Sequence, residues 1–216
     1  MAFRTKQDHV AEVLRERIIS GVYERGEKLR QGDIAEELEV SLTPVREAMK
    51  ILEAEGYIIS MSHRGVLVPP FYVEQAEELF ELRMLLERRL TENAFNRMTS
   101  ERLAELEAIQ AEYATATSSM DRNQLRSANY RFHFRMYEWA NEPQTLAFVR
   151  VLWAKYPFHY LDAIKSRTTR AVREHQAFLI QAQAGNVEGA LEAMEEHIRA
   201  GWKEFSQQQI VNVASP

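Results

Sequence analysis

The chain has 216 residues, with 27 Lys and Arg against 32 Asp and Glu, and no cysteine. This length fits one large domain or two small ones, and the lack of cysteine excludes disulfides and thiolate metal sites. No apolar run approaches the roughly 20 residues that a membrane-spanning helix needs, and the N-terminus lacks the apolar core of a signal peptide. We therefore expect a cytoplasmic protein that has no membrane partner.

The N-terminal third of the sequence has the pattern of a winged helix-turn-helix. Apolar residues at helical spacing and two β-rich runs predict three helices and two strands, at about 7–20, 31–38, 41–56, 57–61 and 65–68. Gly21 is expected to end the first helix, and Ser41 to cap the third, which has Pro44 in its first turn. This order of elements is suited to placing the third helix in a DNA major groove.

Three side chains of the third helix are candidates for contacts with DNA. Arg46 and Lys50 are four residues apart, so they share the helix face that would meet the base edges. A solvated helix face without a function is the alternative. Thr43 could contact a phosphate or support the cap of the helix.

The charge of this first domain constrains where DNA could lie. Residues 1–70 contain 10 Lys and Arg and 12 Asp and Glu, a net charge of −2, whereas DNA-binding modules are usually basic. The basic residues must therefore gather on one face, and Arg30 is among the candidates. His63 and Arg64, in the turn between the strands, could enter the minor groove, although an exposed turn without a function also explains them.

After Pro69 and Pro70 the sequence has the pattern of helices only. Two prolines cannot continue a β-ladder, so we expect a DNA-binding domain at 1–70 and a helical domain at 71–216. Periodicity predicts six helices in the second domain, at about 73–98, 100–118, 121–140, 143–162, 166–184 and 187–209. The expected fold is mostly α, a winged helix-turn-helix followed by an antiparallel bundle of about six helices.

Polar residues interrupt the apolar stripes of four of these helices. They are Arg83, Glu87, Asn129, His133, His175 and His197. A buried polar group without a partner costs about 1–3 kcal/mol, so these residues are expected to meet one another. Three imidazoles and one amide oxygen that converge in a bundle would form a divalent metal site, although three histidines with separate partners are the alternative. Arg83 could bind a carboxylate of an effector or form an internal ion pair with Glu87.

Several motifs resemble those of a known family. Thr43-Pro-Val-Arg-Glu-Ala-Met49 is similar to the T-P-V-R-E-A-L stretch of GntR-type transcription regulators, and Gly65 corresponds to the glycine of their wing. In the second domain, Phe132-His133, the later Ala140-Asn-Glu-Pro143 and two Glu-His pairs resemble the FCD domain of the FadR subfamily. The resemblance covers nearly the whole chain and implies a DNA-binding domain joined to a helical ligand-binding domain.

The resemblance also implies a divalent metal, for which zinc or nickel suits imidazole best. The implied ligands are His133, His175 and His197. Asn129 stands where the family usually has Asp, and a neutral amide binds metal more weakly and leaves the metal's charge to attract an anionic effector. Gly32 and Leu42 stand where arginine is usual, so the DNA operator is expected to differ from the family's usual one.

The expected function is a ligand-responsive transcription regulator that binds a short inverted repeat of double-stranded DNA as a homodimer. Its effector would be a small carboxylate held by the metal and by the side chains of Arg83 and Glu87. A metal-dependent enzyme with a three-histidine site is an alternative. Glu174 and Glu196 face about 100° away from the adjacent histidines and are poorly placed as a base, but Glu87 could serve as one. A regulator that senses the metal itself is another alternative.

Overall fold

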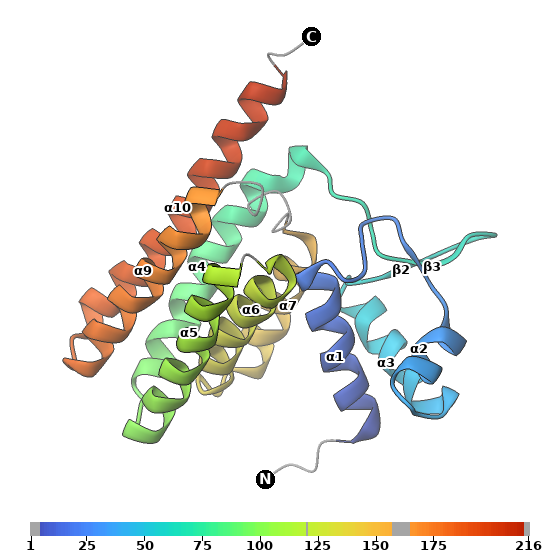
Figure 1. Ribbon diagram of the computed structural model, residues 1–216, viewed down its shortest axis with the longest axis horizontal. Coiled ribbons are helices and arrows are strands. Elements are labelled where there is room, and N and C mark those ends of the chain that lie inside the picture. Colours follow the sequence, from blue (N-terminus) through green and yellow to red (C-terminus); the bar gives the residue numbers. More distant parts are fainter. Residues whose placement is uncertain (1–4, 120, 157–164, 214–216) are drawn as a thin grey trace.

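The structure is a computed structural model that describes residues 5–119, 121–156 and 165–213 (Figure 1). Its N-terminal part holds three helices and a small sheet, and its C-terminal part consists of long helices packed side by side. The fold is mostly α, with the winged helix-turn-helix and the helical domain that the sequence predicts. None of the described helices is long and apolar enough to cross a membrane.

The helices of the winged helix-turn-helix are α1 (Lys6–Ser20), α2 (Gln31–Glu37) and α3 (Leu42–Ala54). Its three antiparallel strands, in the order β1-β3-β2, are β1 (Lys28–Leu29), β2 (Ile59–Met61) and β3 (Gly65–Leu67). Strands β2 and β3 form the predicted hairpin, in which Ser60 pairs with Val66. The sequence does not predict β1, because a strand of two residues is too short to show alternation.

Local sequence explains where α1 begins and ends. Thr5 and Asp8 form a capping box at its start, and Gly21 ends it with a left-handed φ of 77°. Ser41 occupies the predicted N-cap position of α3, but its side chain makes no capping hydrogen bond. The prediction for α3 is therefore right in position and wrong in the contact.

The C-terminal domain contains a short 3₁₀ turn, η1 (Val73–Gln75), before its α-helices. The described α-helices are α4 (Ala76–Phe95), α5 (Ser100–Ser119), α6 (Arg122–Glu138), α7 (Pro143–Lys155), α9 (Lys165–Gln183) and α10 (Val187–Val213). Helix α10 packs on α9 and α4, α5 packs on α6 and α9, and α4 packs on α7. The helix predicted at 143–162 ends at Lys155, since the backbone of Tyr156 is extended, and residues 157–162 lie outside the described residues.

The two domains share one apolar core. Helix α1 packs against α6 and α7, and a single cluster of buried side chains runs from Leu14 and Leu52 to Trp153. Polar contacts add to this interface, because Arg126 donates to the carbonyl oxygen of Ser20 at 3.0 Å. The orientation of the winged helix-turn-helix is therefore set by its contacts with α6 and α7.

Candidate DNA interface and metal centre

Helix α3 separates its residues onto a buried face and an exposed face. The buried side chains are Val45, Ala48, Met49 and Leu52. Thr43, Arg46 and Lys50 are exposed, and their spacing of three and four residues puts them on one face of the helix. Lys50 forms an ion pair with Glu47 at 2.9 Å, but both side chains are exposed, and such pairs are worth at most about 1 kcal/mol. A phosphate could therefore replace Glu47.

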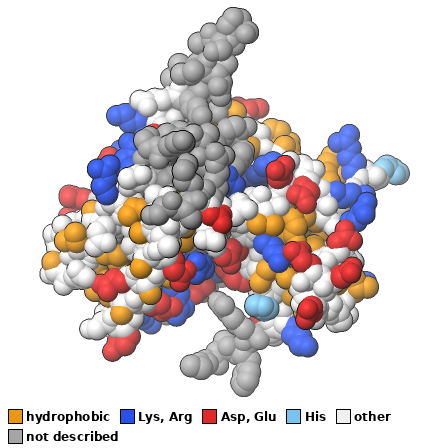
Figure 2. All heavy atoms as spheres, in the orientation of Figure 1, with side chains coloured by type: hydrophobic (Ala, Val, Ile, Leu, Met, Phe, Trp, Pro, Cys, Tyr) orange, Lys and Arg blue, Asp and Glu red, His pale blue; other side chains and the backbone are white. Residues whose placement is uncertain are grey.

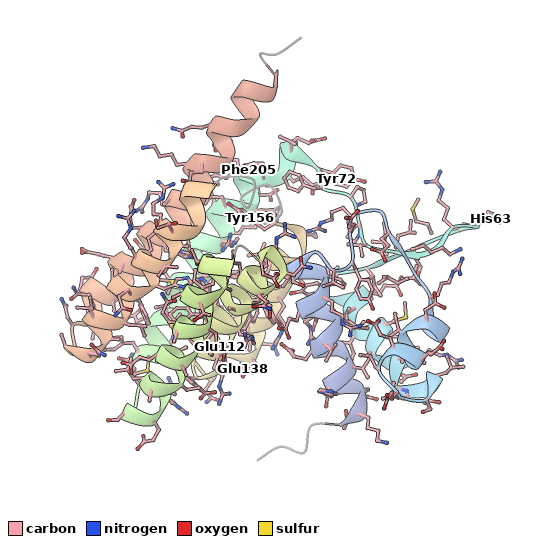
Figure 3. The ribbon with its side chains drawn as sticks, in the orientation of Figure 1. His63, Tyr72, Glu112, Glu138, Tyr156 and Phe205 are labelled. Atoms are coloured by element: carbon pink, nitrogen blue, oxygen red, sulfur yellow. The ribbon has the colours of Figure 1, made fainter. Side chains whose placement is uncertain are left out.

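The wing and the start of α2 carry the other predicted DNA contacts. His63 has a left-handed φ of 64° and lies at the tip of the hairpin, where it points away from the bundle (Figure 3). Arg64 is exposed beside it, and Figure 2 shows lysine and arginine side chains gathered around this histidine. Arg30 is the exposed N-cap residue of α2. All the predicted DNA-contacting side chains are thus accessible on the winged helix-turn-helix.

Several glutamates of the winged helix-turn-helix bind partners inside the domain. This explains how a domain of negative net charge can still expose positively charged side chains. Glu55 binds Arg15 at 2.5 Å and Glu37 binds Arg17 at 2.6 Å, while Glu53 accepts from the backbone N–H of Ser60 at 3.1 Å. In contrast, three exposed arginines make no ion pair with any residue that the structure describes. These arginines are Arg30, Arg46 and Arg64.

The structure gives no reason for the two positions that depart from the family pattern. A Cβ atom at Gly32 would meet no atom within 4 Å, and Leu42 is 48% exposed at the start of α3. Arginine would fit at both positions.

The three predicted histidines meet in the centre of the bundle. His133 comes from α6, His175 from α9 and His197 from α10, and all three are buried. Their ligand nitrogens lie within 4.8 Å of one another. The three histidines therefore lie together as predicted, and their role as metal ligands stays a prediction.

In two of the histidines, the Nδ1 atom faces an oxygen atom of another side chain. The Gln110 amide donates to the carbonyl oxygen of Val172 at 2.8 Å, so its own oxygen faces His175 Nδ1 at 3.0 Å. His197 Nδ1 lies 2.8 Å from a carboxylate oxygen of Glu174. An amide or carboxylate oxygen only accepts hydrogen bonds, so both Nδ1 atoms carry a proton, and in the neutral imidazoles Nε2 is the nitrogen with the lone pair.

The third histidine is held in the same way. His133 Nδ1 lies 3.0 Å from the hydroxyl of Tyr137, which donates to Glu87 at 2.6 Å. Burial and the charge of Glu87 raise the pKa of Tyr137 well above its usual value, so the hydroxyl keeps its proton for Glu87 and accepts from His133. The Nε2 atoms of His133 and His197 then face each other at 3.1 Å, close enough to share one proton or to bind one cation together.

One pair of the three donors has the spacing that a divalent metal ion needs. Two nitrogens at the usual zinc distance of about 2.0–2.1 Å lie about 2.8–3.4 Å apart for angles between 90° and 109°. The separation of 3.1 Å between His133 and His197 falls in this range. Outer oxygens that fix the tautomer of each ligand histidine are the usual second layer of metal sites. Asn129 is half-buried one turn before His133 on α6, and its role as a ligand stays a prediction.

Arg83 and Glu87 form the internal ion pair that was one of the two alternatives. Arg83 Nε donates to Glu87 at 2.6 Å, and both side chains are buried. Glu87 also accepts from the indole N–H of Trp153 at 3.0 Å, and the Arg83 guanidinium lies 4.2 Å from the ring centroid of Tyr156. Burial lowers the pKa of Arg83, but the charge of Glu87 more than offsets this and the pKa is raised.

Sequence reasoning missed the residues that support the histidines. Tyr137 is four residues after His133 and therefore on the same helix face, which is a signal that could have been used. Glu174 is adjacent to His175, and the rotation of about 100° that makes it a poor base there turns it toward α10, where it binds His197. Gln110 carries no such signal, because its contact with His175 depends on how α5 packs on α9.

An exposed winged helix-turn-helix joined to a helical domain with a buried histidine centre defines the class of ligand-responsive DNA-binding regulators. The profile of the bacterial regulatory proteins of the gntR family matches residues 6–68, and that of the FCD domain matches residues 78–200. The chain belongs to the GntR family of transcription regulators and has an FCD effector-binding domain.

Similar proteins are themselves transcription regulators. The HTH-type transcriptional regulator McbR of Escherichia coli is 26% identical over 201 residues, which cover 89% of this chain and 91% of McbR. The Exu regulon transcriptional regulator of the same species is 35% identical over 122 residues, which cover 50% of this chain and 47% of the relative. The solved structure of E. coli McbR/YncC has the same fold, with a TM-score of 0.81 at 23% identity, over 95% of this chain and 99% of that one.

Proposed function

We propose that the protein is a homodimeric regulator that binds a short inverted repeat of DNA and responds to a small carboxylate at a divalent metal centre. The observation that carries this proposal is the buried set of three imidazoles, whose ligand nitrogens lie within 4.8 Å of one another while their Nδ1 atoms face oxygens. His133, His175 and His197 would hold zinc or nickel, with Asn129 as a weak further ligand. When bound, the metal supplies a positive charge that attracts an anion.

An enzymatic role has less support, because the nearby acids have other partners. Glu174 is hydrogen-bonded to the outer nitrogen of His197, and Glu87 is paired with Arg83. A hydrolytic metal site needs a general base that is within reach of the metal-bound water. Since both carboxylates serve to position other side chains, the centre is better suited to holding a ligand than to catalysis.

A series of contacts leads from the histidines to α7. His133 contacts Tyr137, Tyr137 donates to Glu87, and Glu87 accepts from Trp153 on α7. Every member of this series is buried. A change in the packing around the metal would therefore change the position of α7, which contacts the DNA-binding domain.

Arg25 connects the end of α7 to the winged helix-turn-helix. Its guanidinium donates to the carbonyl oxygen of Ala154 at 2.9 Å and to that of Tyr156 at 3.4 Å. It also donates to the carbonyl oxygen of Pro69 at 3.2 Å, at the predicted domain boundary. An effector that favours one packing of α7 would thus change the orientation of the DNA-binding domain, with a coupling that is typically about 1–3 kcal/mol.

The metal assignment is tested by metal analysis of the purified protein and of His175→Ala. The parent is expected to contain about one divalent ion per chain and the variant much less, because two imidazoles hold the metal far less tightly than three. His9→Ala, which changes an exposed histidine of α1, is the control and should keep its metal. Equal metal content in the parent and His175→Ala would refute the assignment.

The same proteins should be titrated with operator DNA in the presence and absence of candidate carboxylates. We expect carboxylates to change the operator affinity of the parent and to leave that of His175→Ala unchanged. A fully retained response after loss of the metal would make the metal a structural support only.

The homodimer is proposed because one recognition helix per chain makes too few contacts for tight specific binding, and twofold dimers read inverted repeats. Neighbouring helices α4 and α7 expose apolar side chains, with Leu85 67% and Phe148 63% accessible. Antiparallel pairing of two α4 helices about an axis near Leu85 would bring Glu81 of one copy opposite Arg89 of the other, both of which are exposed. We therefore expect a second copy to cover this face.

Replacement of Leu85 by glutamate is expected to convert the dimer into a monomer at micromolar concentration, since it places two like charges at the twofold axis. Analytical ultracentrifugation measures the change. Leu85→Ala should weaken the dimer less, and Ile180→Glu, a similar change on the exposed surface of α9, should leave it intact. A Leu85→Glu protein that stays fully dimeric would place the interface elsewhere.

A further inference from the structure

A cavity that is separate from the histidine centre lies between the two domains. It has a volume of about 300 Å³ and is formed by the C-terminal end of α1 and the turn after it on one side, and by α6 and α7 on the other. Its walls include Ile18, Ile19, Tyr23, Arg25, Arg126 and Trp153. Small-molecule sites have volumes of about 300–1,000 Å³ and occur preferentially at domain interfaces.

The positive charge of Arg25 on the wall of this cavity is balanced by backbone dipoles and not by an ion pair with a described residue. Arg25 donates only to backbone carbonyl oxygens and forms no ion pair with any carboxylate in the described part of the chain. Burial lowers the pKa of its guanidinium. The buried Arg15 and Arg83 differ, because each binds a glutamate and has a raised pKa despite burial. Arg25 is half-buried, and carbonyl dipoles compensate such a charge only in part, so an anion beside it would be stabilised.

The rest of the wall defines the kind of anion that would fit. Arg126 contributes a second guanidinium, which donates to the carbonyl oxygen of Ser20 at 3.0 Å. Ile18, Ile19 and Trp153 provide an apolar surface, and Tyr23 provides an aromatic ring with a hydroxyl. Glu24 is the one acid among the described lining residues, and it is exposed. A flat apolar body with one negative group matches these surfaces.

We infer that this cavity binds a small organic anion with a flat apolar body, whose charged group lies against Arg25 and Arg126. The site is distinct from the histidine centre, and its ligand need not bind metal. Because one wall belongs to α1 and the other to α6 and α7, the ligand would hold the two domains in the orientation described above. Trp153 also contacts Glu87, so the occupied cavity and the histidine centre share a wall.

The inference is tested by calorimetric titration of the full-length protein with benzenesulfonate. A sulfonate is a poor metal ligand, so its binding reports on the cavity and not on the histidines. We expect saturable binding of one molecule per chain, and binding of the neutral benzyl alcohol that is at least about tenfold weaker, which is the worth of one charge-assisted hydrogen bond. Equal affinity for both compounds, or no saturable binding, would overturn the inference.

Variants then locate the bound anion. Arg126→Gln is expected to bind benzenesulfonate at least about tenfold more weakly, and Arg126→Lys, which keeps the charge, should lose less. Arg97→Gln is the matched control, because Arg97 is exposed after α4, does not line the cavity and also donates to a backbone carbonyl oxygen. Unchanged binding by Arg126→Gln would refute the site.

The His175→Ala protein separates this site from the metal centre. It should bind benzenesulfonate like the parent if the cavity is the site, whatever the outcome of the metal analysis. Loss of benzenesulfonate binding in His175→Ala would assign the anion to the histidine centre instead. If Arg126→Gln fails to fold, Arg126→Lys and the comparison of the two compounds still decide the question.

Discussion

Replacement of Glu87 by alanine is expected to lower the free energy of unfolding by about 3–5 kcal/mol, because it leaves a buried charge without its partner. The carboxylate is fully buried and binds Arg83, Tyr137 and Trp153 together. Urea denaturation measures the loss, and the midpoint should fall without a change in the slope.

Glu105→Ala is the matched control for this experiment. Glu105 binds Arg135 between α5 and α6 with the same chemistry, but both side chains are 41% exposed, and exposed pairs contribute about 0–1 kcal/mol. A loss of the same size in Glu87→Ala and Glu105→Ala would contradict the argument from burial.

A double variant separates charge from hydrogen bonding. Arg83→Met combined with Glu87→Met removes both buried charges, and such replacements are often tolerated. Tyr137 and Trp153 would still lose their acceptor, at a cost of about 1–3 kcal/mol each. The double variant is therefore expected to be more stable than Glu87→Ala and less stable than the parent.

The histidine centre could be predicted from sequence because its members break an apolar stripe. His133, His175 and His197 each occupy a position where helical spacing demands a buried side chain, and a buried polar side chain needs a partner. The same reasoning finds Arg83 and Glu87. Sequence could not decide whether Arg83 pairs with Glu87 or binds a carboxylate of an effector, since both alternatives place the two side chains on one stripe.

The residues that connect the domains could not be predicted in this way. Arg25 lies in the turn between α1 and β1, where no periodicity reports burial, and its partners are backbone carbonyls far away in the sequence. Tyr156 has an extended backbone at the end of α7, whereas aromatic spacing favours a helix that continues. Contacts between domains depend on packing that no local pattern encodes.

Under the proposed function, these contacts are the route by which an effector signal would travel. The DNA-binding domain touches the bundle through α6 and α7, and α7 carries Trp153, which touches Glu87. A ligand changes this arrangement only by its different affinity for two packings. Glu87 is therefore the residue at which the histidine centre and the domain interface meet, and its variants should change the effector response more than variants of the exposed ion pairs.

Replacement of Arg46 by alanine is expected to weaken operator binding by about 1–3 kcal/mol per half-site, or about 2–6 kcal/mol for a dimer on two half-sites. Arg46 is exposed on α3 and makes no ion pair with another described residue, so its guanidinium is available to a guanine edge or a phosphate.

Lys50→Ala should cost less and reduce the salt dependence of binding by about one phosphate contact per half-site. Fluorescence anisotropy at several salt concentrations measures both effects. Arg97→Ala, which changes an exposed arginine of the helical domain, should bind like the parent, and unchanged affinity in Arg46→Ala would show that α3 does not face the DNA.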